Sequence, residues 1–188
     1  MPPSVSASDH LHRILDEIQQ INSDAEKLVA GLTEDQLNWI PAPGAWSINL
    51  CLEHLRVSNE QMRPMLEGAM SRAKQRAANS EKPYKPTMIG GWMINTMRQT
   101  DGKRKFRAPK NFQPQPDPPP GGLPRFLQSQ RMLASLVERA QGLDLSVTLR
   151  SPVTALMRYN LGDAYEIAAA HARRHVAQAG RVKAQMPK

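Results

Sequence analysis

The stretch NLGDAYEIAAAHARRHVAQAGRV, residues Asn160 to Val182, decides how the rest of the chain can be arranged. Asn160, followed three residues later by Asp163, is similar to a capping box, a pattern typical of a helix start. No proline interrupts the residues that follow. His171 and His175 are four residues apart, so on a helix they lie on one face, one turn apart. Two imidazoles with this spacing can bind one metal ion, and the stretch therefore predicts a long helix carrying part of a metal site.

The composition favours one helical domain. A chain of 188 residues can bury a core, and 40% hydrophobic residues with only 5% aromatics and ten methionines leave little support for an all-β fold. The single cysteine, Cys51, excludes an intrachain disulfide and cysteine-rich zinc sites. The N-terminus lacks the apolar segment of a secretory signal, and no run of about 18 apolar residues could span a membrane. We therefore expect a single cytoplasmic domain over residues 1–188, without a membrane partner.

Three further stretches have apolar residues at three- and four-residue steps, the period of an amphipathic helix. They predict helices over Ser8–Val29, from a cap at Ser47 to about Ala78, and over Leu123–Gln141. Pro64 should kink or break the second of these, because it removes a backbone hydrogen bond. Together with the C-terminal stretch, these segments predict an all-α fold, a four-helix bundle.

Residues 79–123, between the second and third predicted helices, are rich in proline: nine of the sixteen prolines lie between Pro83 and Pro124. They predict a long, extended crossover, with a short helix or turn at Gly90–Met97 and a loop again later, at Ser151–Tyr159. Three aromatic residues are expected to anchor the crossover to the bundle, namely Trp92, Phe106 and Phe112.

The positive charge is concentrated in this region. The chain has a net charge of +8, and Arg72–Lys110 contains eleven Lys or Arg against only Glu81 and Asp101. A basic segment can bind phosphate backbones or anionic substrates. This one has no regular interleaving of aromatics and no reading helix, and a solvated loop explains it more simply. Nucleic-acid binding is therefore the weakest functional hypothesis.

Three of the five histidines, His54, His171 and His175, fall inside predicted helices. A site of three imidazoles would leave a coordination position open, as catalytic metal sites do. Neutral imidazole suits zinc, nickel, iron or copper. The alternative is an ordinary solvated helix face, since an HxxxH pair beside arginines is a weak signal and no HExxH motif is present. His10 and His12, at the start of the first helix, are expected to be exposed to solvent.

No catalytic residue can be assigned from the neighbouring polar side chains. Asp163 is expected to cap its helix, and Glu53 should point about 100° away from His54 around the helix axis. Gln178 could orient a ligand or bound water, or could be a polar residue at the bundle edge. Cys51 is expected to be a buried small hydrophobic residue more than a nucleophile or ligand.

Three segments in this order resemble the DinB/YfiT-like superfamily of four-helix-bundle metalloenzymes. They are a lead-in LTEDQLNWIPAPGAWS after an amphipathic first helix, the segment WSINLCLEHL (Trp46 to Leu55), and HARRHVAQ (His171 to Gln178). The resemblance extends from about Leu11 to Val182. Its most specific part is the combination of W-S-x6-H-L with a late H-x3-H-x2-Q.

The resemblance implies an up-down-down-up bundle in which His54, His171 and His175 bind a divalent metal, with zinc or nickel as first candidates. It also implies a thiol-dependent S-transferase or a hydrolase-like enzyme acting on a small molecule, with a low-molecular-weight thiol as one candidate. The basic crossover departs from the family pattern and would shape the entrance for an anionic substrate. The rival hypothesis is a non-catalytic helical module that binds metal or forms a homodimer in a stress-related role.

Overall fold

The computed structural model describes residues 5–74, 83–100, 108–116, 118–154 and 156–187. This part of the chain is mostly helical, which confirms the predicted class, and it also contains a small two-stranded sheet that was not predicted. The four long helices are α1 (Ala7–Val29), α3 (Ile48–Lys74), α5 (Gly122–Arg139) and α6 (Leu161–Lys183). The shorter elements are α2 (Glu34–Asn38), α4 (Met88–Arg98), the 3-10 helix η2 (Lys110–Phe112), β1 (Thr148–Arg150) and β2 (Arg158–Asn160).

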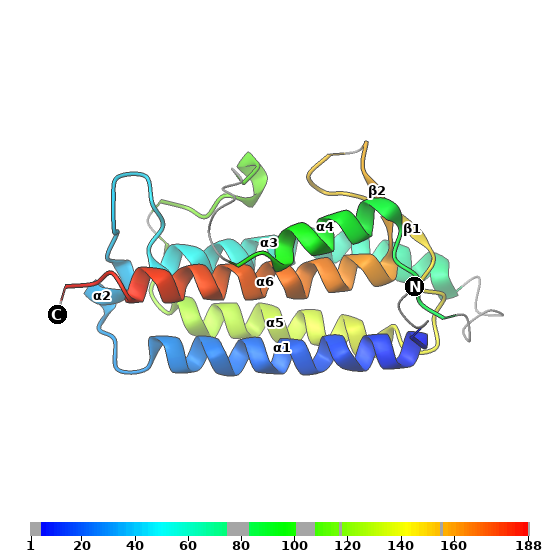
Figure 1. Ribbon diagram of the computed structural model, residues 1–188, viewed down its shortest axis with the longest axis horizontal. Helices are drawn as coiled ribbons and strands as arrows, with labels where there is room; N and C mark the ends of the chain where they lie inside the picture. Colours follow the sequence, from blue (N-terminus) through cyan, green and yellow to red (C-terminus); the bar gives the residue numbers. More distant parts are fainter. Residues whose placement is uncertain (1–4, 75–82, 101–107, 117, 155, 188) are drawn as a thin grey trace.

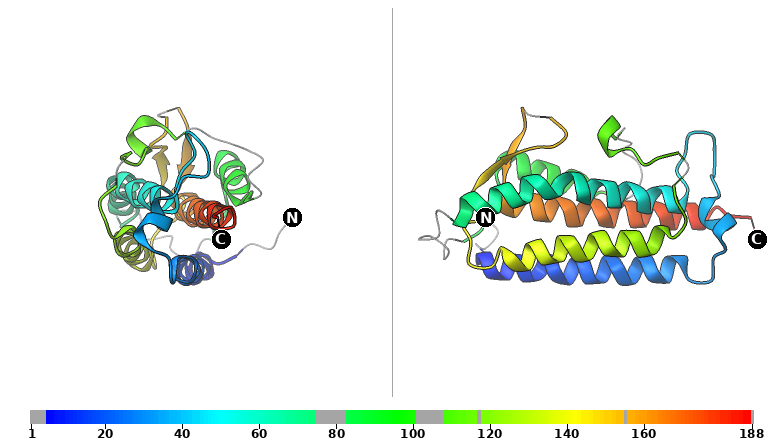
Figure 2. Two further views of the ribbon diagram at one scale, coloured as in Figure 1. Left: turned by 90° about the vertical axis from the view of Figure 1, so that its left-hand side faces the viewer. Right: turned by 180° about the vertical axis from the view of Figure 1, so that it is seen from behind.

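The four long helices lie side by side, and each packs against two others: α1 against α5 and α6, and α3 against α5 and α6 (Figures 1 and 2). The colours in Figure 1 show that α1 and α6 run in one direction and that α3 and α5 run in the other. Because α3 and α5 are parallel neighbours, the chain between them must return along the whole length of α3. That helix has 27 residues, which corresponds to about 40 Å. A long connection is therefore required by the topology.

The hydrogen bonds at the starts of α6 and α3 agree with the helix caps that the sequence predicts. At α6 the Asn160 side chain accepts a hydrogen bond from the Asp163 backbone N–H at 2.7 Å, and Asp163 accepts one from the Asn160 N–H at 3.1 Å. This confirms the predicted cap. At α3 the Ser47 hydroxyl accepts a hydrogen bond from the Leu50 N–H at 3.1 Å, as a helix N-cap does.

Pro64 is expected to kink or break the second long helix. The helix is not broken there, because α3 continues through Pro64; its predicted end near Ala78 lies outside the described residues. Most of the segment predicted as a loop, Ser151–Tyr159, connects the two strands of a hairpin, but its last two residues belong to β2, which corrects the prediction there. Leu149 of β1 pairs with Tyr159. Both of these residues are buried, so strand pairing places two large apolar side chains in the core.

The predicted short helix inside the crossover is α4, which packs against α6. Of the three predicted anchors, Phe112 is buried, as expected. Trp92 is not an anchor, since 58% of it is exposed: it lies on the outer face of α4. Phe106 lies outside the described residues.

His10 is buried, contrary to the prediction, whereas His12 is exposed as predicted. His10 lies on the inner face of α1, where its Nε2 is 3.2 Å from the carbonyl oxygen of Gly162 on α6. Its ring also stacks on Tyr84 at a centroid distance of 3.6 Å. The helix start is therefore not frayed, because the crossover and α6 cover it.

The core between α3 and α6 determines how these two helices face each other. Burying one leucine-sized side chain stabilises a fold by about 1.5–3 kcal/mol. The buried apolar residues of this part of the core are Ile21, Ala25, Ile48, Cys51, Leu52, Leu55, Phe126, Ala172, Val176, Ala179 and Val182.

Within the described residues no helix is both long and apolar enough to cross a membrane.

Candidate metal centre

The packing of α3 against α6 brings together the three histidines that lie inside predicted helices. One ring nitrogen each from His54, His171 and His175 lies within 4.8 Å of the other two. The Nε2 atoms of His54 and His171 are 3.1 Å apart. Two nitrogens bound to one tetrahedral zinc would be separated by roughly 3.3 Å, given Zn–N bonds of about 2.0–2.1 Å. The three side chains are therefore close enough to hold a single ion.

The positions of these side chains follow from the apolar pattern of both helices. On α3, His54 stands one turn after Cys51 and next to Leu55, both of which are buried. On α6, the buried residues Ala172 and Val176 each follow a histidine directly. Burial of the apolar residues turns the histidines toward the seam between the two helices.

The orientation of His54 is set by the crossover. Its Nδ1 lies 2.7 Å from the backbone carbonyl oxygen of Phe112, in η2. A carbonyl can only accept a hydrogen bond, so Nδ1 carries the proton and donates it. In the neutral ring this leaves the Nε2 lone pair directed toward the other two histidines, an arrangement common among metal-binding histidines.

The surroundings of His175 also fit a cation. Its Nδ1 is buried and has no well-aligned hydrogen-bond partner among the described residues. A buried polar atom left unsatisfied costs about 1–3 kcal/mol. The ring of Trp46 covers the cluster from one side, 4.8 Å from the His54 ring and 5.7 Å from the His175 ring, measured between centroids. An ion bound to the three rings would accept lone pairs that now meet only other imidazoles, such as those of the His54 and His171 Nε2 atoms, 3.1 Å apart.

Burial keeps all three imidazoles neutral. Loss of hydration is the main cause that lowers the pKa of His54, and the Phe112 carbonyl opposes it in part. For His171, loss of hydration and the neighbouring His175 and His54 rings hold the pKa well below its ordinary value. The pKa of His175 falls to about 3, chiefly through loss of hydration, while Gln178 opposes this shift. Neutral imidazole is the form that binds metals.

The cluster is not fully buried. His54 is buried, whereas His171 and His175 are partly exposed. Three protein ligands leave a coordination position for a further ligand, which is the arrangement of catalytic rather than structural zinc sites. Among the described residues the cluster contains no carboxylate and no thiol.

The other candidate residues have structural roles. Cys51 is fully buried among apolar side chains, and burial raises the pKa of its thiol to about 12, as expected of a small core residue. Glu53 is buried and accepts hydrogen bonds from Arg56, with Arg125 at 3.3 Å. Asp163 is eight residues before His171 on α6, about 12 Å along the axis, and caps the helix.

The sequence did not indicate that Phe112 and Trp46 contribute to the site. Phe112 was considered only as an apolar anchor, yet its backbone carbonyl orients His54. A backbone group has no signature in the sequence, so no signal could have identified it. Trp46 belongs to the WSINLCLEHL segment, and its ring contacts two of the histidines. A tryptophan eight residues before a helical histidine could have suggested this contact.

Comparison with known proteins gives the family of the chain. A family model described as the DinB superfamily matches residues 17–179, which include all three histidines and Trp46. The searches of curated proteins and of solved structures returned no match.

Proposed function

Since the chain belongs to the DinB superfamily, we propose that it is a metal-dependent enzyme in which His54, His171 and His175 hold a divalent ion. Zinc and nickel are the first candidates, because neutral imidazoles without thiolate or carboxylate ligands suit both. The observation that carries the proposal is the approach of three imidazole nitrogens, from two helices, to within 4.8 Å of one another.

The chemistry we propose is transfer of a low-molecular-weight thiol to a small-molecule substrate, with hydrolysis as the second candidate. When bound, a divalent cation lowers the pKa of a coordinated water or stabilises a thiolate. The described part of the cluster offers no carboxylate that could act as a base. This favours a thiol, whose ordinary pKa of about 8.5 is already close to neutral. The Phe112 carbonyl holds His54 in place, and Trp46 excludes water from one side.

Metal content tests the proposal directly. Protein purified without chelator should contain a stoichiometric amount of metal by mass spectrometry, and His171→Ala should contain far less. His12→Ala is the matched control, since His12 is exposed on α1 and should leave the metal content unchanged. Metal well below stoichiometry in the unmodified protein, or full retention by His171→Ala, would contradict the proposal.

Cobalt substitution separates the two reactions. If the site binds a thiol, a small thiol added to the cobalt-loaded protein should produce a new sulfur-to-cobalt charge-transfer band in the near ultraviolet. The same thiol should produce no band with His171→Ala. A cobalt-loaded protein whose spectrum does not respond to any thiol would favour hydrolysis.

The second candidate is a non-catalytic module that forms a homodimer. Three apolar side chains of α4 support it: Met88 is 94% exposed, Ile89 39% and Trp92 58%. Exposed apolar groups of this size are typical of contact surfaces. Sedimentation analysis of Trp92→Ser should show a weakened dimer, and His171→Ala should leave the dimer intact. A monomer at all protein concentrations would remove this candidate.

We also infer that the whole chain, residues 1–188, is one domain: a four-helix bundle formed by α1, α3, α5 and α6, with residues 79–123 as its crossover. Support comes from the pairwise packing of these helices and from a core shared by all four. A cytoplasmic location stays a prediction from the sequence.

A further inference from the structure

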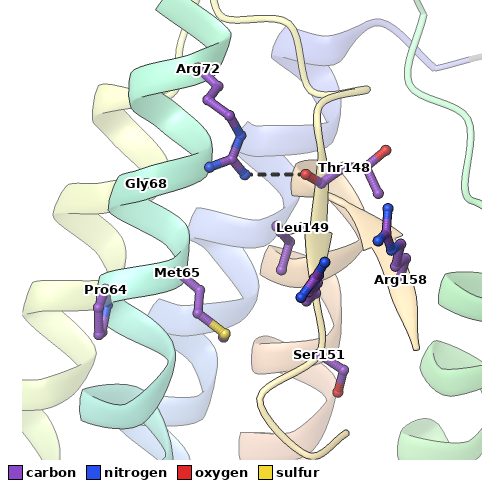
Figure 3. A pocket seen from close by; sticks show the side chains of 9 residues that line it. Pro64, Met65, Gly68, Arg72, Thr148, Leu149, Ser151 and Arg158 are labelled. Atoms are coloured by element: carbon purple, nitrogen blue, oxygen red, sulfur yellow. Dashed lines mark hydrogen bonds between the residues drawn. The ribbon is translucent and has the colours of Figure 1, made fainter. Parts of the chain in front are cut away.

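A second site lies beside the hairpin, farther along α3. An open pocket of 460 Å³ lies beside the contact between α3 and the hairpin and is lined by residues of α3, β1 and β2 (Figure 3). This volume lies within the range of about 300–1,000 Å³ that small-molecule pockets occupy. Its walls include three arginines, two hydroxyl residues and apolar surface, provided by Arg72, Arg150, Arg158, Thr148, Ser151, Pro64 and Met65.

Two of the three arginines face each other across the hairpin, although this arrangement does not stabilise the fold. The strand register places Arg150 directly opposite Arg158, and both are exposed. Like charges in directly opposed positions destabilise a strand pair. From α3, Arg72 extends toward the hairpin and donates a hydrogen bond to the Thr148 carbonyl at 3.2 Å (Figure 3). Three positive charges therefore surround one pocket.

In the part of the chain that the structure describes, no acidic side chain pairs with Arg150 or Arg158. The pocket is lined by no Asp or Glu, and the described residues provide neither Arg150 nor Arg158 with an ion pair or hydrogen bond. A guanidinium group offers a planar fork of donors that matches phosphate and carboxylate oxygens. The missing counter-charge is what a bound anion would supply.

We propose that this pocket binds a phosphorylated small molecule. The phosphate dianion would lie between Arg150 and Arg158, with Arg72 on the opposite wall. The organic part of the ligand would contact the apolar wall formed by Pro64, Met65 and Leu149. A monoanion would leave much of the positive charge unbalanced, and a purely inorganic ion would leave the apolar wall uncovered.

The pocket is separate from the candidate metal centre. Pro64 follows His54 by ten residues on α3, which corresponds to about 15 Å along the helix. A ligand in the pocket therefore does not need the metal, and the proposal stands whether or not the histidines bind one.

Calorimetric titration of the full chain with phenyl phosphate, at constant ionic strength, tests the proposal. Arg150→Gln and Arg158→Gln should each weaken binding by about tenfold or more, the usual effect of removing a hydrogen bond to a charged group. Arg150→Lys should also bind more weakly than the unmodified protein, because a single ammonium replaces the fork. Phenol, which has the same ring without the phosphate, should not bind.

Two controls make a loss of binding interpretable. Arg131→Gln removes an exposed arginine on α5, outside the pocket, and should bind phenyl phosphate as the unmodified protein does. Thermal melting of each variant should show no loss of stability, because replacing either member of a like-charged pair removes a repulsion. In NMR spectra of the unmodified protein, phenyl phosphate should shift the backbone amide signals of Thr148–Ser151.

Three results would overturn the proposal. The first is unchanged affinity in both Arg150→Gln and Arg158→Gln. The second is a set of NMR shifts centred on His54 instead of the hairpin. The third is much tighter binding of a single-stranded oligonucleotide than of phenyl phosphate, with a steep dependence on salt. That result would identify a nucleic-acid surface in place of a small-molecule site.

Discussion

At the scale of single residues, the contacts of His10 determine the protonation state of its ring. Its Nε2 faces the Gly162 carbonyl, which can only accept a hydrogen bond, and its Nδ1 is 3.1 Å from the Arg13 guanidinium, which can only donate. The ring is therefore neutral, with its proton on Nε2. Loss of hydration is the main cause that lowers its pKa to about 4, and Arg13 adds to this shift.

This residue should make stability depend on pH. The pKa of His10 in the folded protein is about 4, below the ordinary value of 6.5. At pH values between these two, the unfolded chain therefore binds more protons than the folded protein does. The stability due to neutral His10 is fully present above pH 6.5 and is lost as the pH falls toward 4. At pH 5 the loss is about 2 kcal/mol. Urea unfolding of the unmodified protein and of His10→Gln, at pH 7.5 and pH 5, measures this loss of stability.

The comparison between the two proteins isolates the contribution of His10 to the pH dependence of stability, because the other buried histidines contribute equally in both proteins. His10→Gln should lose less stability between the two pH values than the unmodified protein does. His12→Gln, which changes an exposed residue on the same helix, should show the unmodified dependence. Equal pH dependence in all three proteins would mean that His10 does not titrate as described.

At the scale of elements, one carboxylate of α6 fixes the start of α4. Asp163, already part of the α6 cap, accepts hydrogen bonds from the Tyr84 hydroxyl at 2.7 Å and from Thr87, through its N–H at 3.1 Å and its hydroxyl at 2.7 Å. Gly90 approaches the same carboxylate so closely that a Cβ there would lie 2.1 Å from an Asp163 oxygen. The close approach of α4 to α6 therefore requires a residue without a side chain.

Two adjacent glycines test this contact. Gly90→Ala should destabilise the fold by about 2 kcal/mol or more, because the added methyl group must displace α4 or break its hydrogen bonds to Asp163. Gly91→Ala is the matched control: its Cβ would have Pro86 as nearest neighbour, at 3.9 Å. It should be neutral or stabilising by up to about 1 kcal/mol, from helix propensity. Urea unfolding measures both, and equal effects would contradict the close packing.

The hairpin provides a second test at this scale. Arg150→Gln should stabilise the ligand-free protein by about 0.2–1 kcal/mol at low ionic strength, because it removes the charge facing Arg158. Added salt should reduce the gain, since the Debye length falls to about 8 Å at 0.15 M. Thermal melting at low and high salt measures this, with Arg131→Gln as control. A destabilised Arg150→Gln would show that the two arginines do not repel each other.

At the scale of the whole molecule, the three histidines join helices that are far apart in the sequence. His54 on α3 and the pair on α6 are separated by more than a hundred residues, so an ion that binds all three would connect two packed elements. Such a ligand stabilises the folded state by mass action, because the unfolded chain does not keep the three rings together.

Metal should therefore raise the stability of the folded chain. Adding zinc at about 100 times its dissociation constant to metal-free protein should increase the free energy of unfolding by about 2.7 kcal/mol. His54→Ala should not respond, and His12→Ala should respond as the unmodified protein does. Denaturant unfolding with and without zinc measures the gain. An equal gain in His54→Ala would place the metal elsewhere.

The sequence by itself determined the features that depend on near neighbours. The Asn160–Asp163 cap, the amphipathic helices and the presence of His171 and His175 on one helix face all follow from spacings of three or four residues. Such spacings act within one turn of a helix, so they can be recognised before anything is known of the rest of the chain.

Only the tertiary structure decided what depends on contacts between distant segments. It buried His10, brought the Phe112 carbonyl to His54 and placed Arg150 opposite Arg158. The physical reason is that helix packing and strand register depend on how the whole core fills. A one-residue change of register would have placed other side chains together, with no local trace in the sequence.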